Sequence, residues 1–246
     1  MKAFYEVPFL SIDTETTGID PFSERVVTMS MVVNYPDDMN RPDVIKEWLI
    51  NPGVDIPESA AAVHGVTNEM AQANGVVPEI ALAEIATALT KWDATGNPVV
   101  IFNSQFDATL LRNEFDRNNI DYNGEFTRVI DPYVLDRFVD KWRKGKRTLE
   151  AMSEHYGVTL TDAHNSSADS IAAAQILRKM GEKHSDKLNL SSEDLFVIQQ
   201  KAKKEQAESM QKYFTSKGQE AFVPTAWPFR TLETDALDKK NYGLTA

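Results

Sequence analysis

The alternation of hydrophobic and polar positions near the start of the chain predicts three β-strands. Residues 7–15 and 44–50 alternate between apolar and polar side chains, and residues 25–34 are β-branched and apolar. Short polar turns separate these segments. A parallel crossover needs a dozen or more residues, so neighbouring strands are predicted to pair antiparallel, as a meander.

The pattern changes after residue 78, where strands alternate with helices. Two short apolar runs, residues 98–102 and 128–130, are predicted to be strands. Helical spacing of apolar residues predicts helices over 78–92, 105–117, 132–142, 148–156 and 167–180. Strand–helix alternation indicates parallel strands, so the predicted fold class is α/β: a mixed sheet of an antiparallel meander plus parallel strands, flanked by helices.

The last quarter of the chain has a different character. A long polar helix is predicted to begin near Ser191, which with Asp194 resembles a capping box, and to stop near Gly218. The remaining residues have no clear period and are interpreted as an arm that packs on the domain or on a second copy. We therefore predict a domain at 1–182 and a C-terminal helical extension and arm at 183–246.

Composition narrows the class of protein. The chain has 246 residues, of which 42% are hydrophobic and 26% charged, which is ordinary for a globular protein with a sizeable core. It contains no cysteine, which excludes disulfide scaffolds, thiolate metal sites and a cysteine nucleophile. No run of about 18 apolar residues and no secretory h-region is present, so we expect a cytoplasmic protein without membrane contact.

The net charge of −11 argues against a protein that coats nucleic acid through bulk electrostatics. The same net charge is compatible with a protein that binds phosphate at a local basic site or through metal ions. The acidic excess lies within residues 1–180, because residues 181–246 hold equal numbers of acidic and basic side chains. Candidate acids for metal binding or catalysis are therefore expected within residues 1–180.

Asp13 and Glu15 lie two positions apart at the carboxyl end of the first predicted strand. A period of two places both on one face of the strand, at the edge where open α/β sheets bind ligands. Two close carboxylates repel, and one takes up a proton unless a cation lies between them. The alternative is a pair of acids on a solvated strand end.

Two more acids lie at predicted helix starts. Asp107 is in the first turn of the helix after strand 98–102, with Asn103 or Ser104 as candidate caps. Asp169 is in the first turn of the helix at 167–180, and Ser166 with Asp169 fits a Ser-x-x-Asp box. Each acid could simply favour the helix dipole. His164, five residues before Asp169, could be structural or could face the same cavity.

Taken together, four carboxylates and one histidine are predicted to meet at one sheet edge. Oxygen ligands suit hard divalent cations. Two such ions about 3.5–4 Å apart can clamp a phosphodiester, and a histidine can remove a proton from the attacking water near neutral pH.

Three blocks of sequence resemble those of the DEDD exonucleases, histidine type. These blocks are Asp13-Thr14-Glu15-Thr16-Thr17-Gly18, Asn103-Ser104-Gln105-Phe106-Asp107, and His164 followed by Asp169. Two further segments, Asn51-Pro52-Gly53 and Val63-His64-Gly65-Val66-Thr67, resemble the linking loop of the branch that holds bacterial polymerase proofreading subunits. The resemblance covers roughly Phe9–Leu177 and leaves the extension outside the family pattern.

The resemblance implies a ribonuclease-H-like fold and release of 5′-mononucleotides from a 3′ end. It implies that Asp13, Glu15, Asp107 and Asp169 hold two Mg²⁺ or Mn²⁺ ions and that His164 is the general base. It also suggests which residues line the terminal nucleotide of the substrate, expected to be single-stranded DNA: Thr14, Thr16, Thr17, Val63, His64, Asn103 and Phe106.

A basic cluster at 141–147 joins two predicted helices. Lys144, Lys146 and Arg147 are candidate contacts to the substrate backbone, and the alternative is a solvated loop with Trp142 tucked beneath it.

Other functions remain open at this point. The same metal site could trim RNA ends, and sequence does not separate DNA from RNA. A non-catalytic subunit could use the fold to dock on a polymerase or, through its extension, on a second copy. A nucleotide-binding oxidoreductase is disfavoured, because no Gly-x-Gly-x-x-Gly occurs in the chain.

Overall fold

A five-stranded mixed sheet forms the centre of the protein. The computed structural model describes residues 3–122, 124, 126–161 and 165–241. The strands lie in the order β3-β2-β1-β4-β5, with β1–β2 and β2–β3 antiparallel and β1–β4 and β4–β5 parallel. Their bounds are β1 (Phe9–Thr16), β2 (Val26–Asn34), β3 (Val44–Leu49), β4 (Val99–Val100) and β5 (Val129–Ile130). The predicted mixed α/β sheet is confirmed.

The predicted helices are present, with one shorter than expected. They are α3 (Pro78–Asp93), α4 (Gln105–Arg117), α5 (Pro132–Val139), α6 (Leu149–Tyr156), α7 (Ser166–Lys183) and α9 (Ser192–Ser216). The prediction that α5 reaches Trp142 was wrong. After Val139 the chain turns back, and Arg143 and Arg147 bond the Asp136 carboxylate on α5.

Several short helices were not predicted. They are α1 (Glu58–His64), α2 (Asn68–Asn74), α8 (Ser185–Leu188), α10 (Leu232–Asn241) and the 3₁₀ turns η1 (Phe4–Glu6) and η2 (Asp37–Met39). Val63 and His64, expected in a loop, therefore lie in the last turn of α1, which ends at Gly65 with a φ of 76°.

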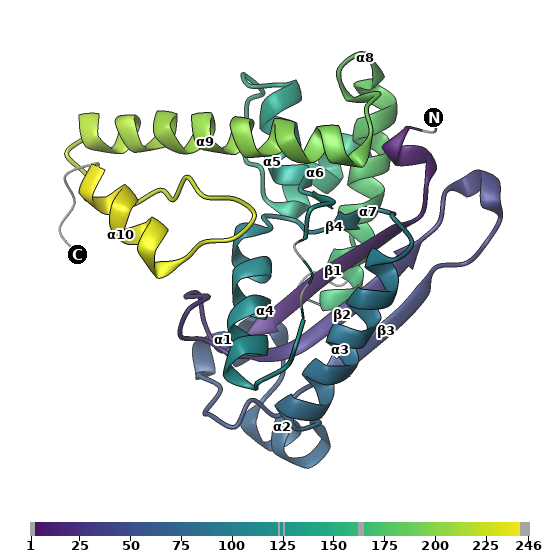
Figure 1. The fold of residues 1–246 in the computed structure, drawn as a ribbon, viewed down its shortest axis with the longest axis vertical. Coiled ribbons are helices and arrows are strands. Elements are labelled where there is room, and N and C mark those ends of the chain that lie inside the picture. Colours follow the sequence, from purple (N-terminus) through teal and green to yellow (C-terminus); the bar gives the residue numbers. More distant parts are fainter. Residues whose placement is uncertain (1–2, 123, 125, 162–164, 242–246) are drawn as a thin grey trace.

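The two faces of the sheet pack against different helices (Figure 1). Leu10 and Ile12 of β1 belong to a core cluster with residues of α3 and α4. Phe9, on the opposite face, belongs to a second cluster with residues of α5, α6 and α7. Odd-numbered residues of β1 therefore face α7, and this alternation continues to the end of the strand.

The carboxyl end of β1 lies at an open fork of the sheet. β4 pairs with β1 only at Leu10 and Ser11, and the chain then turns into α4. On the other side β1 stays paired with β2 as far as Thr16, with a register irregularity after Glu15. The first turn of α4 thus enters beside the end of β1.

The C-terminal extension packs on this domain. Gln199 of α9 accepts a hydrogen bond from the Asp131 backbone N–H at 2.7 Å, and its amide donates to the Val129 carbonyl. Beyond α9 the arm returns to α4, where Trp227 is buried in the main core cluster. The arm thus packs on the domain of the same chain, which is one of the two predicted alternatives; the other was packing on a second copy. No helix of the described residues is long and apolar enough to cross a bilayer.

Candidate metal centre

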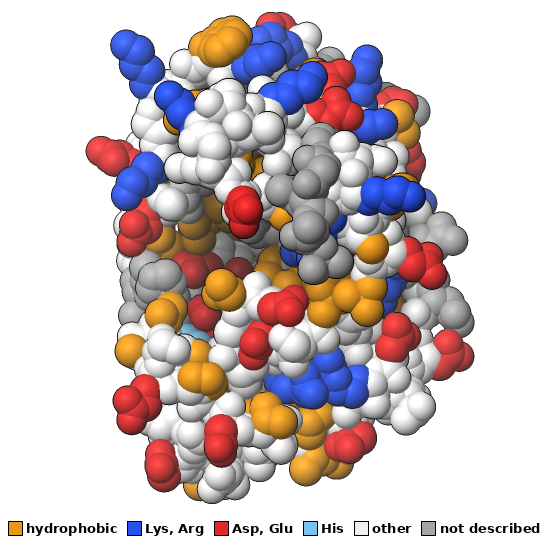
Figure 2. Space-filling view, turned by 90° about the vertical axis from the view of Figure 1, so that its left-hand side faces the viewer, with side chains coloured by type: hydrophobic (Ala, Val, Ile, Leu, Met, Phe, Trp, Pro, Cys, Tyr) orange, Lys and Arg blue, Asp and Glu red, His pale blue; other side chains and the backbone are white. Residues whose placement is uncertain are grey.

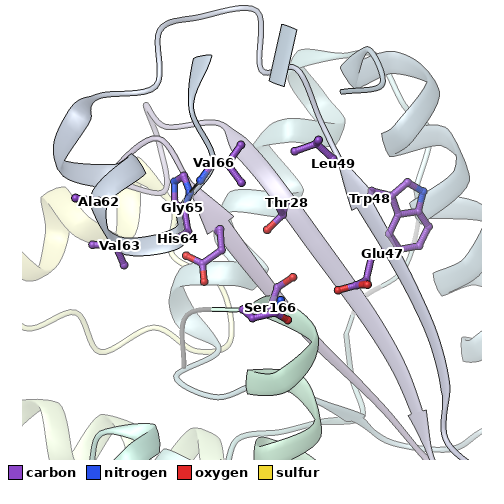
Figure 3. Close-up of a pocket in the computed structure, with 12 residues that line it drawn as sticks. Thr28, Glu47, Trp48, Leu49, Ala62, Val63, His64, Gly65, Val66 and Ser166 are labelled. Carbon is purple, nitrogen blue, oxygen red and sulfur yellow. Dashed lines mark hydrogen bonds between the residues drawn. The ribbon is translucent and has the colours of Figure 1, made fainter. Parts of the chain in front are cut away.

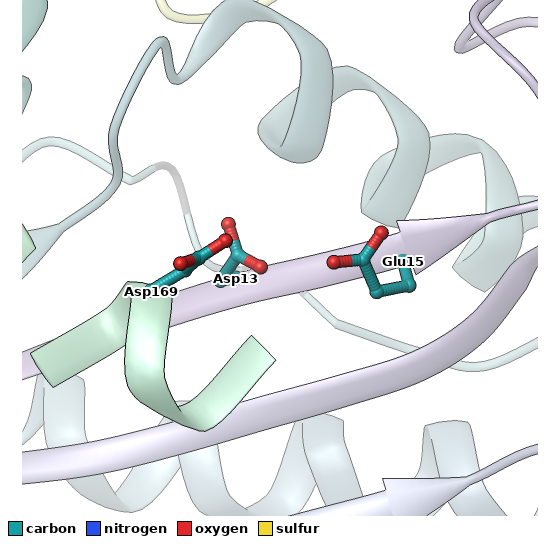
Figure 4. A group of neighbouring side chains, drawn as sticks. All are labelled: Asp13, Glu15 and Asp169. Atoms are coloured by element: carbon teal, nitrogen blue, oxygen red, sulfur yellow. The ribbon is translucent and has the colours of Figure 1, made fainter. Parts of the chain in front are cut away.

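Three carboxylates from two elements meet at the carboxyl end of β1. Asp13, Glu15 and Asp169 each offer an oxygen, and these atoms all lie within 4.8 Å of one another (Figure 4). Asp13 and Glu15 project from the β1 face that packs on α7, and Asp169 comes from the first turn of α7. The predicted convergence of these acids at one sheet edge is what the structure shows.

Asp107 approaches the same place from the other side of β1. The Thr14 hydroxyl donates a 2.6 Å hydrogen bond to Asp107 Oδ1, and both residues are buried. Asp107 is not part of the tight group of three, yet its charge acts on both Asp13 and Glu15. The predicted group of four is therefore a close triad with a fourth carboxylate held alongside it.

The start of α7 is held by the Asn165 cap and by hydrogen bonds from Ser30 of β2. The Asn165 side chain caps the helix by accepting from the Ser167 and Ala168 backbone N–H groups. The expected Ser166 cap was wrong, because Ser166 is already the first helical residue. The Ser30 hydroxyl, opposite Asp13 in the sheet register, donates to the Ser166 carbonyl at 2.7 Å and lies 2.6 Å from the Ser170 hydroxyl.

Ser30 was missed by the sequence analysis. Its signal is a polar residue between two buried methionines, Met29 and Met31, and its effect is to hold Asp169 opposite Asp13.

The start of α4 depends on a buried acid that the sequence analysis also missed. Asp131 accepts from the Asn103 and Ser104 backbone N–H groups and from the Ser104 hydroxyl, at 2.9–3.0 Å. Of the two candidate caps, Ser104 occupies the N-cap position, although its side chain makes no cap bond, and Asn103 adopts a left-handed φ of 56°. Asp131 thus positions the turn that carries Asp107.

Burial and mutual repulsion perturb these acids. Burial, then the charge of Asp107, Asp169 and Glu15, raises the pKa of Asp13 well above 3.8. Burial, then Asp169 and Asp107, raises the pKa of Glu15 to about 7. Burial raises the pKa of Asp107 to about 7, although the Thr14 hydrogen bond opposes this.

A cation would relieve this repulsion. Carboxylate oxygens are hard donors, and this close set of them fits a hard divalent cation.

A cavity of about 500 Å³ opens beside Glu15 (Figure 3). Val63 and His64 of α1 line one side, Trp48 of β3 lines another, and Ser166 of α7 lies near the acids. Of the predicted substrate contacts, the structure brings Val63 and His64 to this cavity, whereas Thr14, Asn103 and Phe106 are not among its lining residues. Trp48 was not anticipated.

His64 has a defined orientation in this cavity. Its Nδ1 accepts from the Val66 backbone N–H at 3.1 Å, so the proton of the neutral ring sits on Nε2. Burial lowers the pKa of His64, although the Thr16 backbone opposes this. Nε2 itself is buried and has no hydrogen-bond partner among the described residues.

Other predicted residues have local roles or fall outside the description. The Thr16 hydroxyl donates to the Gly18 carbonyl at 2.6 Å, and the Thr17 hydroxyl donates to Glu24 at 2.5 Å, so both shape the turn after β1. His164, the predicted general base, lies outside the described residues.

The basic cluster at 141–147 contains two kinds of side chain, arginines paired with a buried carboxylate and exposed lysines. Arg147 bonds the fully buried Asp136 carboxylate at 2.6 Å, and Arg143 bonds the same group at 3.0 Å. Lys144 and Lys146 are exposed. Figure 2 shows acidic side chains in a hollow of one face of the molecule, with Lys and Arg side chains gathered at the upper end of that face.

Comparison with known proteins places this arrangement in a family. A family model described as RNase_T, exonuclease, matches residues 10–177. A DNA polymerase III subunit epsilon-like protein of Rhodobacter capsulatus is 28% identical over 178 residues, covering 71% of this chain and 24% of the relative. A PolC-type DNA polymerase III of Oceanobacillus iheyensis is 25% identical over 181 residues, covering 73% of this chain and 12% of the relative.

Solved structures share the fold. A structure of exonuclease I matches with a TM-score of 0.61 and 21% identity, covering 72% of this chain and 41% of that one. E. coli exonuclease I in complex with a dA16 oligonucleotide matches with a TM-score of 0.62 and 18% identity, covering 83% and 45%.

The chain spans about a quarter or less of the length of the two curated relatives. The family match, in contrast, extends from β1 to α7 and so takes in every element that carries the four acids. The chain belongs to the RNase T exonuclease family, the DEDD exonucleases.

Proposed function

We propose that the protein is a metal-dependent 3′–5′ exonuclease that hydrolyses single-stranded DNA from its 3′ end and releases 5′-mononucleotides. The observation that carries this proposal is the triad of Asp13, Glu15 and Asp169, with ligand atoms within 4.8 Å of one another, in a chain of an exonuclease family. A phosphodiester backbone is anionic, so these acids can approach it only through cations.

Asp13, Glu15, Asp107 and Asp169 are the residues that would hold two Mg²⁺ or Mn²⁺ ions. Such ions activate water and steady the leaving oxygen of a phosphodiester. Thr14 orients Asp107, and Ser30 fixes the helix end that carries Asp169. His164 would accept the proton of the attacking water, the role of general base.

The terminal nucleotide would lie between the acids and the cavity beside Glu15. Val63 and His64 line that cavity and would contact the nucleotide. Asn103 and Phe106 precede Asp107 around the start of α4 and would contact the nucleotide from the other side.

DNA is the favoured substrate because the relatives are polymerase III proteins and because one solved neighbour is exonuclease I with a dA16 oligonucleotide. RNA trimming uses the same metal chemistry, so the choice of sugar is a matter for experiment. The remaining alternative is a non-catalytic subunit that docks on a polymerase. Such a subunit would not need the close group of Asp13, Glu15 and Asp169.

The test uses 5′-labelled single- and double-stranded DNA and RNA, each with Mg²⁺, Mn²⁺ or a chelator, resolved to single nucleotides. We expect stepwise loss of 3′ nucleotides, fastest on single-stranded DNA. The chelator and Asp13→Ala should abolish it, whereas Asp55→Ala, at an exposed acid outside the centre, should leave it unchanged. Cleavage that persists in chelator, or binding without cleavage in Mn²⁺, would contradict the proposal.

A further inference from the structure

A groove of about 370 Å³ lies between α5 and α9, away from the cavity beside Glu15. Its walls combine aromatic and basic side chains: Arg137, Phe138, Lys141 and Trp142 on the α5 side, and Met210 and Tyr213 on α9. We call this the α5/α9 groove. Only its α5 side lies within the span of the family match, and α9 belongs to the extension.

The rings of the α5/α9 groove are open to solvent. Trp142 is 83% exposed, Tyr213 55% and Phe138 40%. An exposed aromatic side chain contributes little to the stability of the fold. Three of them around one groove therefore indicate a surface that binds a ligand. Flat rings with open faces suit the bases of a single strand, since every base has a π-face to stack.

The positive charges of the groove are available to a ligand. Neither Arg137 nor Lys141 forms an ion pair with a carboxylate among the described residues. Arg137 Nε is buried without a hydrogen-bond partner in that part of the chain, and its guanidinium lies 5.1 Å from the Tyr133 ring. Lys141 lies 5.3 Å from the Trp142 ring.

The neighbouring arginines differ in this respect. Arg143 and Arg147 are committed to the buried Asp136, so they cannot serve a ligand without leaving a buried charge unpaired. Among the described residues, Glu205 is the one acid that lines the groove beside Arg137 and Lys141. The charge balance of the groove therefore favours an anion.

α5 runs to the groove from the carboxyl edge of the sheet, the edge at which the acids lie. This helix begins directly after Asp131, the residue that positions the start of α4. Phe102, in the turn between β4 and α4, packs edge-on against Tyr133 with ring centroids 6.1 Å apart, and the Arg137 guanidinium lies over the same Tyr133 ring. The eight residues of α5 span roughly 12 Å, which is the reach of a few nucleotides.

We propose that the α5/α9 groove binds the single strand a few nucleotides 5′ of the end that is cut. Bases stack on Trp142 and Tyr213, and backbone phosphates contact Arg137 and Lys141. The inference builds on the proposed exonuclease function and gives that function a substrate class: single strands long enough to reach from the metal centre to α9.

The experiment compares a long and a short substrate in the same enzyme. The long one is an oligothymidylate of about twelve nucleotides, and the short one is a thymidine dinucleotide, which can occupy the metal centre alone. We expect Trp142→Ala to raise KM for the long substrate about tenfold and to leave the dinucleotide unchanged. Lys141→Ala should lower the salt dependence of KM for the long substrate.

Matched controls lie on the same helix pair. Val197→Ala and Lys201→Ala remove an exposed apolar and an exposed basic side chain of α9 outside the groove, and neither should change KM. Because Trp142 is exposed, its variant should keep the parent melting temperature, and Tyr213→Ala provides a second, independent variant.

The outcomes separate the two proposals. No hydrolysis of either substrate by the parent would refute the exonuclease function itself. Hydrolysis of both, with equal effects of Trp142→Ala on long and short substrates, would overturn the groove assignment alone. A parent that is dimeric in solution and a Trp142→Ala variant that is monomeric, with unchanged KM, would instead mark the groove as a contact between copies and overturn its role in binding strands.

Discussion

Thr14 and Asp107, which are 93 positions apart in sequence, are joined by a 2.6 Å hydrogen bond between buried side chains. Thr14 lies between the two β1 acids but points to the opposite face, toward α4. The bond therefore ties the strand that carries Asp13 and Glu15 to the helix that carries Asp107. It also stabilises the charged form of Asp107, whose pKa burial raises to about 7.

Loss of this hydroxyl should weaken metal binding. In Thr14→Val the Asp107 carboxylate loses a donor, so its pKa rises further and the ion must displace a more tightly held proton. We expect about tenfold weaker Mn²⁺ affinity near pH 7, consistent with about 1.5 kcal/mol for a hydrogen bond to a charged group. Thr14→Ser keeps the hydroxyl and is the control. Equal calorimetric Mn²⁺ affinities for Thr14→Val and parent would refute this role.

The ion-free protein should become less stable as the pH rises toward neutrality. The pKa of Glu15 and of Asp107 is raised to about 7 in the folded chain, mainly by burial, whereas such groups titrate near 4 when unfolded. The folded state therefore binds protons more tightly, and these groups cost stability progressively between about pH 4 and pH 7.

Divalent cations should reverse that loss over the same interval. The increase in melting temperature produced by Mn²⁺ is expected to grow from about pH 5 to pH 8, because protons leave and ions take their place. Differential scanning fluorimetry in chelator and in Mn²⁺ measures both effects. Asp13→Asn should flatten both curves, and a Mn²⁺ increment that is the same at every pH would rule out competition with protons.

The sequence predicted the elements that have strong periods and missed those positioned by distant contacts. β1, α4 and α7 follow from apolar spacing, and the meeting of β1 and α4 at one sheet edge follows from the parallel pairing of β1 with β4. Asp131 could not be assigned, because its role depends on backbone groups that reach it from the turn before α4. α10 was missed because its polar sequence has hardly any apolar face, and α1 because it is only seven residues long.

Arg147 is expected to act on stability rather than on substrate binding. Its guanidinium and that of Arg143 satisfy Asp136, which is fully buried and also accepts from the Tyr156 hydroxyl at 2.8 Å. Arg147→Ala leaves part of that buried charge unpaired and should lower the free energy of unfolding by about 3 kcal/mol. Urea denaturation measures this.

The exposed neighbours provide the contrast. Lys144→Ala with Lys146→Ala should leave the unfolding midpoint unchanged and, if these residues contact the substrate backbone, reduce the salt dependence of KM. If Arg147→Ala keeps the parental stability and raises KM, Arg147 contacts the substrate and does not stabilise the fold.

The C-terminal arm should support the metal centre through α4. Trp227 is buried, its ring lies 5.2 Å from Phe196 of α9, and it shares a core cluster with Ala108 and Leu111 of α4. The Gln105 amide, two residues before Asp107, donates to the Ala226 carbonyl. Trp227→Ala should therefore lower the free energy of unfolding by about 3 kcal/mol and also loosen the first turn of α4.

Two measurements separate these effects. Urea denaturation reports stability, and Mn²⁺ affinity, measured well below the melting temperature, reports the placement of Asp107. We expect both to fall in Trp227→Ala, and neither in Leu232→Ala, whose side chain is 70% exposed on α10. If Trp227→Ala loses stability but keeps full Mn²⁺ affinity, the arm stabilises the domain without positioning Asp107, because α4 would then hold its first turn through Thr14 and Asp131 alone.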